Sequence, residues 1–329
     1  MKGRRQMVKL IRRPDLRRLS VQYACTFDRT NKPIARVKTG ELLDIETLDA
    51  YGALITPAHD LKSALTEGPL VIRNPITGPL FVEGAEPGDA LVMEILKISL
   101  PGRGVTLIKP ASGGLEGWPQ GSEALTKFSD ITEGIIDFVM GDGRAVPLAA
   151  KPFIGTVGVA PAFGSIASIV PGRHGGNLDS SDICVGNKLI LPVAVRGALF
   201  GLGDVHALQG DAEICGTAVE VSSKVRIRLG LMKGKAVGWP RIEAPSGIIV
   251  LGSGKPLEDA ARHAFREMME WLRDDYKVDT YDAYMLLSLT AEVRVAQMVN
   301  PLYTVSVKLP EVVLKHLGGR PVNGPFKSA

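Results

Sequence analysis

The sequence predicts a mainly β fold of the α+β type, in which a β-sandwich or jelly-roll-like body has two C-terminal helices packed against it. Three observations support this prediction. Short segments rich in Val and Ile are separated by turns, and the chain holds 37 glycines and 22 prolines. Helical periodicity begins only near residue 253. Strand and helix patterns do not alternate along the chain, which argues against a parallel βαβ sheet.

The predicted strands occupy most of the first 250 residues. Residues 34–48 and 81–98 alternate apolar and polar positions around a glycine-containing turn, which is typical of a hairpin. The further strand candidates are 90–98, 153–159, 188–195, 214–221, 224–230 and 246–251. Because no low-complexity linker follows, we expect a single domain over residues 19–329 behind a basic arm, residues 1–18.

The predicted helices lie near the C-terminus. Apolar residues recur at helical spacing over residues 253–276, with Ser253 in the N-cap region and Pro256 in the first turn. A second helix is predicted over about 280–298 and ended by Asn300-Pro301. Residues 303–309 then predict a returning strand.

The net charge of +4 comes from the N-terminal arm, which holds eight Lys/Arg and one acid within residues 1–18. Such an arm can bind nucleic acid or anionic lipid, but we interpret it as a solvated or partner-packed extension. We expect no nucleic-acid partner. No apolar run approaches the roughly 18 residues that a membrane span needs, so we expect no membrane partner. Three cysteines without a C-x-x-C pair fit a reducing, cytoplasmic location.

Two stretches concentrate the residue types that bind metals and move protons. They are "GRHGGNLDSSD" (172–182) and "GDVHALQGDAE" (203–213), with two of the five histidines. Alternate residues of a strand share a face, so Asp204 and His206 are expected to project together. Imidazole combined with carboxylate is the usual ligand set of zinc and similar divalent ions. The stretches are therefore candidates for one metal site, although a histidine beside an aspartate is often only a hydrogen-bonded pair.

The first stretch also offers backbone donors, because Gly175 and Gly176 would let N–H groups approach a ligand closely. The second stretch resembles half of a cupin metal motif, but Val205 stands where that motif needs another histidine. A cupin-like metalloenzyme of another reaction class therefore stays an alternative. The sequence has no G-x-S-x-G elbow, no P-loop and no G-x-G-x-x-G after a strand.

Longer blocks of the chain carry a family resemblance. The chain resembles the acetamidase/formamidase family over roughly residues 34–309, most specifically in the joint presence of H-G-G-N-[LM]-D and G-D-x-H-x-x-x-G-D-x-E. The matching blocks are "VKTGELLDIETLDA" (37–50), "NPITGPLFVEGAEPGDALVMEI" (74–95), "KPFIGTVGVAPA" (151–162), "PGRHGGNLD" (171–179), "GALFGLGDVHALQGDAEICG" (197–216) and "YMLLSLTAEVRVAQMVNP" (284–301).

The resemblance implies a homo-oligomeric hydrolase that cleaves a small aliphatic amide, such as formamide or acetamide, to carboxylate and ammonia. It also implies a divalent metal, for which zinc is our candidate, and leaves room for a second, structural ion such as calcium. Glu213, accompanied by Asp211 in the same motif, is the candidate acid/base. Gly175, Gly176 and Asn177 are the candidate oxyanion and substrate contacts. The candidate metal ligands are His174, His206, Asp49, Asp179 and Asp204, of which Asp49 rests on the resemblance alone.

The chain also departs from the family pattern. Ala212 stands where the family usually has glycine, Glu292 replaces aspartate, and Asn300 replaces aspartate in the late block. These changes give some support to a third hypothesis, a non-catalytic family member with an altered site, but an amide hydrolase stays our main interpretation.

Overall fold

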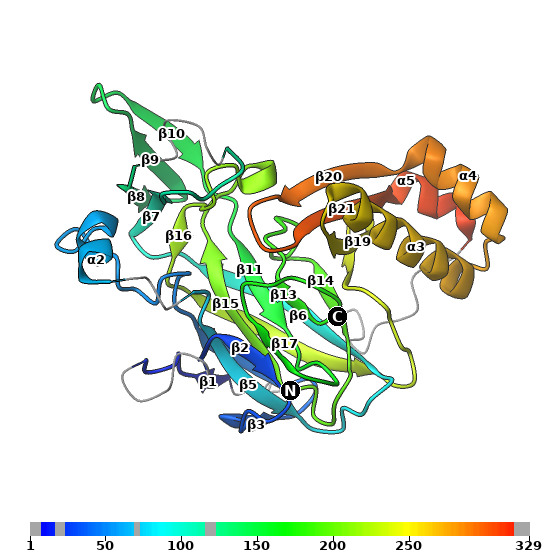
Figure 1. The fold of residues 1–329 in the computed structure, drawn as a ribbon. Coiled ribbons are helices and arrows are strands. Elements are labelled where there is room, and N and C mark those ends of the chain that lie inside the picture. Colours follow the sequence, from blue (N-terminus) through cyan, green and yellow to red (C-terminus); the bar gives the residue numbers. More distant parts are fainter. Residues whose placement is uncertain (1–7, 17–23, 69–72, 116–122, 319–329) are drawn as a thin grey trace, which may run out of the picture.

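A computed structural model describes residues 8–16, 24–68, 73–115 and 123–318. In these ranges the fold is mainly β, and its longest helices lie in the C-terminal part of the chain, as the sequence predicts. Two large sheets make up most of the structure (Figure 1).

Nine described strands form the first sheet, which contains both chain-early and chain-late segments. Their spatial order is β1 (Val8–Ile11), β4 (Leu42–Glu46), β17 (Lys224–Met232), β6 (Ala90–Ser99), β14 (Lys188–Pro192), β18 (Arg241–Ala244), β19 (Gly247–Gly254), β21 (Tyr303–Pro310) and β20 (Glu292–Gln297). The pairings are antiparallel except for β1 with β4.

The second sheet carries the residues of the candidate site. Its order is β10 (Ala145–Ala149), β9 (Ile135–Val139), β8 (Leu125–Thr132), β7 (Arg103–Ile108), β16 (Glu220–Val221), β15 (Phe200–His206), β11 (Phe153–Gly158) and β13 (Gly175–Asn177). Strand β5 (Ile76–Val82) also pairs with β15, and β3 (Ala35–Val37) pairs with β5. A separate pair joins β12 (Ser165–Ala167) to β2 (Thr26–Asp28).

The main hydrophobic core lies between the two large sheets. Leu43 and Ile227 of the first sheet belong to the same buried cluster as Leu202 and Val205 of the second. The two sheets therefore bury one face each against a shared core, which is the arrangement of a sandwich.

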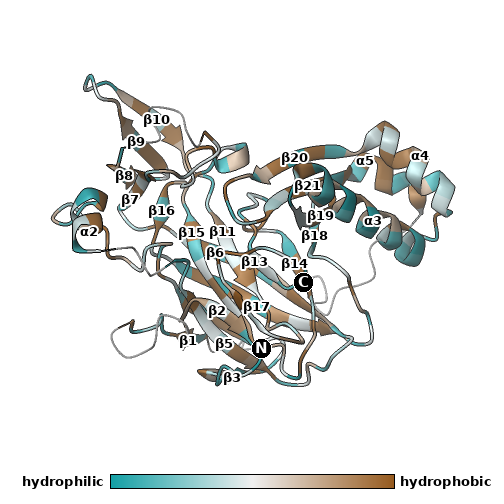
Figure 2. Cartoon of the chain, in the orientation of Figure 1, coloured by the Kyte–Doolittle hydropathy of each residue, from teal (hydrophilic) through white to brown (hydrophobic). Residues whose placement is uncertain are grey.

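The helices within the described ranges are α2 (Leu61–Glu67), α3 (Leu257–Tyr276), α4 (Thr280–Thr290) and α5 (Glu311–Leu314), with single turns η2 (Asp211–Glu213) and η3 (Lys315–Leu317). Strand β19 separates two cores: Ile249 and Leu251 face the sandwich, whereas Ile248 and Val250 face α3 and α4. The side of α3 turned to the viewer is hydrophilic (Figure 2). No described helix is long and apolar enough to cross a membrane.

Several element predictions were wrong in detail. Residues 291–297 do not extend the second helix, because α4 ends at Thr290 and β20 pairs with β21. Most of the predicted strand 214–221 is irregular, and only Glu220–Val221 forms β16. Ser253 lies inside β19, and the N-cap of α3 is Pro256.

The basic arm is partly described. Residues 8–11 form β1 and pair with β4, and the Arg12 guanidinium lies 2.9 Å from Glu46 Oε1. Residues 1–7 and 17–18 of the arm lie outside the described residues. The part of the arm that the structure describes thus adds an edge strand to the first sheet.

Candidate active site

The candidate site lies at the end of β15, in the middle of the second sheet. Asp204 and His206 are two residues apart on this fully buried strand and share a face, as the sequence predicts. The strand register places Glu220 of β16 directly opposite His206. Asp179 follows β13, which joins β15 through β11. Three strands therefore bring these four side chains together.

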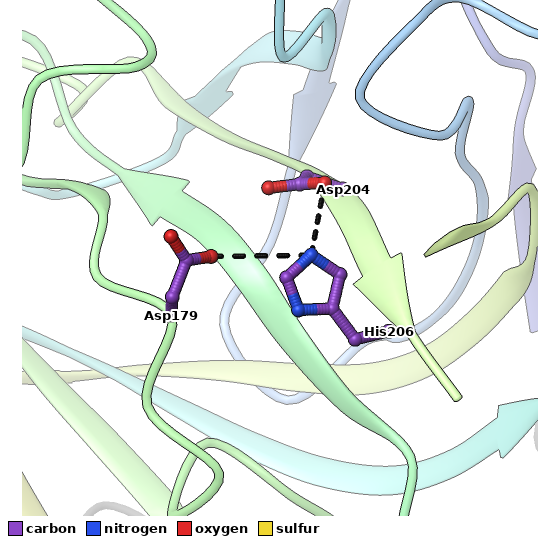
Figure 3. Close-up of side chains that lie close together, drawn as sticks. All are labelled: Asp179, Asp204 and His206. Atoms are coloured by element: carbon purple, nitrogen blue, oxygen red, sulfur yellow. Dashed lines mark hydrogen bonds and ion pairs between the residues drawn. The ribbon is translucent and has the colours of Figure 1, made fainter. Parts of the chain in front are cut away.

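The His206 imidazole is surrounded by carboxylates. Its Nε2 atom lies 3.2 Å from Asp204 Oδ1, 3.2 Å from Glu220 Oε2 and 4.0 Å from Asp179 Oδ1. Figure 3 shows Asp179 and Asp204 converging on this nitrogen from two different segments. All four residues are at most 3% exposed, so solvent screens their charges very little.

Gln209 determines which ring nitrogen faces the carboxylates. Its Nε2 donates to the carbonyl oxygens of Asp179 and Ala296, at 2.9 and 3.0 Å. Its Oε1 is therefore left to accept a hydrogen bond from His206 Nδ1, at 2.9 Å. With a proton fixed on Nδ1, the neutral ring turns the Nε2 lone pair toward the carboxylates, which is the orientation of a metal-ligating histidine.

The remaining carboxylate oxygens are held by amides and a hydroxyl. Asp204 Oδ2 accepts from Asn74 Nδ2 at 2.5 Å and from Thr156 Oγ1 at 3.1 Å. Asp179 Oδ2 accepts from Asn177 Nδ2 at 2.8 Å and from Asn300 Nδ2 at 2.7 Å. One oxygen of each aspartate is thus fixed, and the other points toward His206.

Gly155 lets the two aspartates come close. A Cβ atom at this position would lie 2.6 Å from Asp179 Oδ1 and 2.8 Å from Asp204 Oδ2. Real Cβ atoms do not approach oxygen so closely, so any larger residue would push the carboxylates apart.

The inward-facing oxygens fit a cation. Asp179 Oδ1 and Glu220 Oε2 are buried and have no hydrogen-bond partner among the described residues. A buried, unpaired carboxylate oxygen is costly, and one proton on His206 Nε2 could not serve three carboxylates at once. The possible ligand atoms form two groups, and within each group they all lie within 4.8 Å of one another. One group is Asp179, Asp204 and His206, and the other is His206, Glu213 and Glu220. The donor set therefore suits a divalent ion bound by one imidazole and several carboxylates.

The pKa directions reflect this concentration of buried charge. Burial, and next the charge of Asp204, raise the pKa of Asp179 to about 7. Burial also raises the pKa of Glu220. Burial lowers the pKa of His206, but the Glu220 and Asp204 carboxylates outweigh it and raise this pKa well above its usual value. Without a cation, part of the cluster would take up protons to relieve the repulsion.

Glu213 lines a small cavity beside the cluster. The cavity has a volume of about 50 Å³, and its walls include His206, Glu220 and Tyr51. Burial, and next the charge of Asp179, raise the pKa of Glu213 well above its usual value. A carboxyl group with a raised pKa can exchange a proton near neutrality, which is what a general acid/base requires.

An unusual turn places Glu213 at the cavity. Ala212 and Glu213 have φ angles of 72° and 52°, in the left-handed region that favours glycine. The turn is supported from the C-terminal segment, because Met298 N donates to the Ala212 carbonyl oxygen at 3.1 Å. The strained conformation explains why glycine suits position 212 and shows that alanine can adopt it here.

His174 lies apart from the cluster. Val159 N donates to the His174 carbonyl oxygen, whereas His206 pairs with Phe153. Six residues of extended chain separate these two points, a distance of about 20 Å. His174 instead borders an apolar pocket with a volume of about 530 Å³, and its ring packs edge-on against Phe27 at 5.2 Å. The sequence-based ligand set is revised accordingly, with Glu220 in place of His174.

The burial of His174 predicts an acid-dependent loss of stability. Burial lowers its pKa from 6.5 to about 4, so the unfolded chain binds the extra proton between these values. Stability from neutral His174 is complete above pH 6.5 and falls as the pH drops toward 4. Urea unfolding should show that the parent loses about 2 kcal/mol relative to His174→Gln between pH 7.5 and pH 5. A difference in unfolding free energy between parent and His174→Gln that stays constant with pH would contradict this prediction.

The glycines after His174 serve close packing. A Cβ at Gly175 would lie 2.1 Å from the Val157 carbonyl oxygen, and the Gly175 N–H donates to Gly172 O. A Cβ at Gly176 would lie 2.2 Å from the Val170 carbonyl oxygen. Asn177 does line the cavity, but its Nδ2 donates to Asp179. Neither glycine lines the cavity, so their N–H groups are not the oxyanion donors that the sequence led us to expect.

Asp49 and Asp211 lie beside the site rather than in the cluster. Both Asp49 oxygens are occupied, one by the backbone N–H groups of Tyr51 and Ala53 and the other by the Ser222 hydroxyl. Asp211 is exposed and forms an ion pair with Arg294 at 2.5 Å. Asp49 therefore stabilises a turn next to the cavity, and Asp211 anchors the turn that carries Glu213.

Sequence reasoning missed several residues of the site. The missed residues are Asn74, Lys109, Gly155, Thr156, Gln209, Glu220 and, as a contact, Asn300. For Glu220 a signal existed, because a carboxylate interrupts the apolar run Ala218-Val219-Glu220-Val221. The Asn300 side-chain amide donates a hydrogen bond to Asp179. An aspartate at position 300, which the resemblance leads us to expect, could donate this bond only when protonated.

The family comparison matches nearly all of the described chain. A model described as "Acetamidase/Formamidase family" matches residues 27–169 and 164–316. A formamidase from Methylophilus methylotrophus is 27% identical over 252 residues. That match covers 61% of this chain and 61% of the formamidase, so the chain spans about three fifths of that relative's length.

Two solved structures are similar over almost their whole length. An acetamidase from Yersinia enterocolitica has a TM-score of 0.84 and 33% identity, covering 95% of this chain and 94% of that one. A protein described as a predicted acetamidase/formamidase from Thermoanaerobacter tengcongensis has a TM-score of 0.85 and 33% identity, with coverages of 95% and 99%. Sequence and backbone similarity therefore extend together over the two sheets and the C-terminal helices.

Proposed function

Because the chain belongs to the acetamidase/formamidase family, we propose that it hydrolyses a small aliphatic amide of the formamide or acetamide type to a carboxylate and ammonia. The net reaction adds one water: a C–O bond forms at the carbonyl carbon, the C–N bond breaks, and the departing nitrogen takes up a proton.

The observation that carries this proposal is the cavity beside the buried cluster. Its volume of about 50 Å³ accommodates only a few non-hydrogen atoms, since one water needs roughly 10–15 Å³ by the same measure. Tyr51, Ala50 and Ile169 limit the space with apolar surface, while His206 and Glu213 supply the chemistry. A short acyl chain fits these walls, and a long one does not.

We assign the metal site to Asp179, Asp204, His206 and Glu220. Their inward-facing oxygens and the lone pair of Nε2 converge, and Gln209, Asn74 and Asn300 orient them from behind. Zinc is our candidate ion because imidazole and carboxylate are among its usual ligands. When bound, a divalent cation supplies Lewis acidity, which lowers the pKa of water and polarises a carbonyl group.

We assign proton transfer to Glu213. Its carboxyl group borders both the cavity and the cluster, so it can take a proton from the attacking water and deliver it to the departing nitrogen. Such a role contributes about 10²–10⁴-fold to a rate. The burial that excludes water from Glu213 also keeps the transferred proton within the site.

The proposal is tested by ammonia release from formamide, acetamide, propionamide and butyramide, measured with and without a chelator. We expect turnover of the two shortest amides, a steep decline with acyl length, and loss of turnover after chelation that added zinc restores. Elemental analysis of the purified protein accompanies the assay. If no amide releases ammonia from metal-loaded protein, the chain is not an amidase.

We also propose that the chain functions as a homo-oligomer. Apolar side chains that are well exposed on α4, among them Tyr281 at 78% and Leu289 at 82%, support this assembly.

A further inference from the structure

Gly175 and Gly176, two of the oxyanion donors that the sequence predicted, do not line the cavity, which raises the question of what stabilises the oxyanion. Amide hydrolysis places a negative charge on the former carbonyl oxygen when water adds to the carbon, and enzymes stabilise this charge with fixed donors. Gly175 and Gly176 pack closely against neighbouring backbone, where a larger residue would not fit.

The side-chain amides of the cavity wall are also engaged. Asn74 Nδ2 donates to Asp204 and to Thr156, and Asn300 Nδ2 donates to Asp179. Asn177 Nδ2 likewise donates to Asp179. These amides hold the carboxylates in place, so turning one of them toward substrate would release a buried oxygen.

Lys109 is differently placed. It follows β7 directly, lines the same cavity as Glu213 and Glu220, and lies with Nζ 5.4 Å from the centre of the Tyr51 ring. Among the described residues its ammonium group has no hydrogen-bond or ion-pair partner, and an ammonium group carries three donors. Burial lowers the pKa of Lys109, and the charges of Glu220 and Glu213 oppose that lowering.

We propose that the ammonium group of Lys109 binds the acyl oxygen of the substrate, stabilises the oxyanion and then holds the carboxylate product. This inference rests on the proposed amidase function and adds a residue that the family motifs did not include. Lys109 acts only as a hydrogen-bond donor and transfers no proton. The Tyr51 ring beneath it restricts its position through a cation–π contact, which reduces the entropy lost when substrate binds.

A second cation, Arg73, also lines the cavity but is exposed. It is therefore better hydrated than Lys109, and a hydrated donor stabilises an oxyanion less. This difference in burial is why the assignment goes to Lys109.

The test compares Lys109→Met, Lys109→Arg and a control, Lys62→Met. The control removes a cation from an exposed position of α2, on the protein surface. With acetamide, Lys109→Met should lower kcat by about 10²–10³-fold and change KM much less. Lys109→Arg should restore part of the loss, and Lys62→Met should match the parent. In a separate measurement without turnover, calorimetric titration with acetate should show at least about tenfold weaker binding to Lys109→Met, or 1.4 kcal/mol.

The outcomes separate the two proposals. An active parent whose kcat and acetate affinity survive in Lys109→Met overturns the role of Lys109 and leaves the amidase function standing. Loss of metal or of folded structure in Lys109→Met, seen by elemental analysis and circular dichroism, likewise overturns it in favour of a structural role. A parent inactive on every amide overturns the proposed function itself.

Discussion

Glu213→Gln is expected to lower kcat for acetamide by about 10²–10⁴-fold while the fold and the bound metal are kept. The substitution preserves the side-chain volume in the cavity wall but removes the group that takes up and releases a proton. Burial raises the pKa of this carboxyl group, so the pH dependence of kcat that it causes should disappear together with the rate. Steady-state kinetics from pH 5 to pH 9 and elemental analysis provide the measurement.

The neighbouring acid in the same turn offers a matched control for this experiment. Asp211 is exposed and paired with Arg294, so Asp211→Asn should keep most of the parental turnover. Parental turnover in Glu213→Gln would remove Glu213 from the mechanism, and a large loss in Asp211→Asn alone would move the catalytic role to Asp211.

His206→Ala is expected to abolish stoichiometric metal binding and to destabilise the protein by about 3–5 kcal/mol. The change removes the imidazole on which Asp179, Asp204 and Glu220 converge and leaves these buried carboxylates without a positive partner. The carboxylates then repel one another, and the site has lost its nitrogen ligand. Elemental analysis after dialysis, together with urea unfolding at pH 7.5, measures both effects.

His316→Ala is the control for His206→Ala, because His316 is exposed in η3 and lies outside the cluster. It should change neither metal content nor the free energy of unfolding. One equivalent of metal in dialysed His206→Ala would show that this imidazole is no essential ligand, and the assigned ligand set would then be wrong.

Local periodicity was sufficient to predict part of the site. The two-residue spacing of Asp204 and His206 predicted a shared strand face, and the structure places their side chains 3.2 Å apart. Glu220 could not be found in this way, because it meets His206 through the register of β15 with β16. Strand register depends on the whole fold, whereas side-chain alternation depends only on neighbours in the sequence.

His174 and Asp179 show the same limit within a single motif. Five positions separate them in the sequence, and a short motif suggests one site. Strand β13 instead runs along β11, so it carries Asn177 to Thr156 and leaves His174 near Val159 at the far end. An extended segment rises by about 3.3 Å per residue, so residues at the two ends of a motif in a strand lie far apart and can belong to different sites.

The fold class was predictable because burial and turn composition are local signals. The mainly β body and the C-terminal helices are confirmed, but the boundary near residue 291 was wrong. Residues 291–297 include Ala, Glu, Arg and Gln, which suit a helix, yet pairing with β21 forms β20. Tertiary pairing thus overrides a weak local preference.

The hydrogen bond from Asn300 to Asp179 has a consequence for biosynthesis. A chain emerging from the ribosome in order exposes Asn74 first, the two motif aspartates about a hundred residues later or more, and Asn300 about a hundred residues after those. Until Asn300 has been synthesised, the Asp179 carboxylate lacks one of its hydrogen-bond donors. The proposed metal ligands therefore have their full set of supporting hydrogen bonds only after the segment that carries Asn300 has been synthesised.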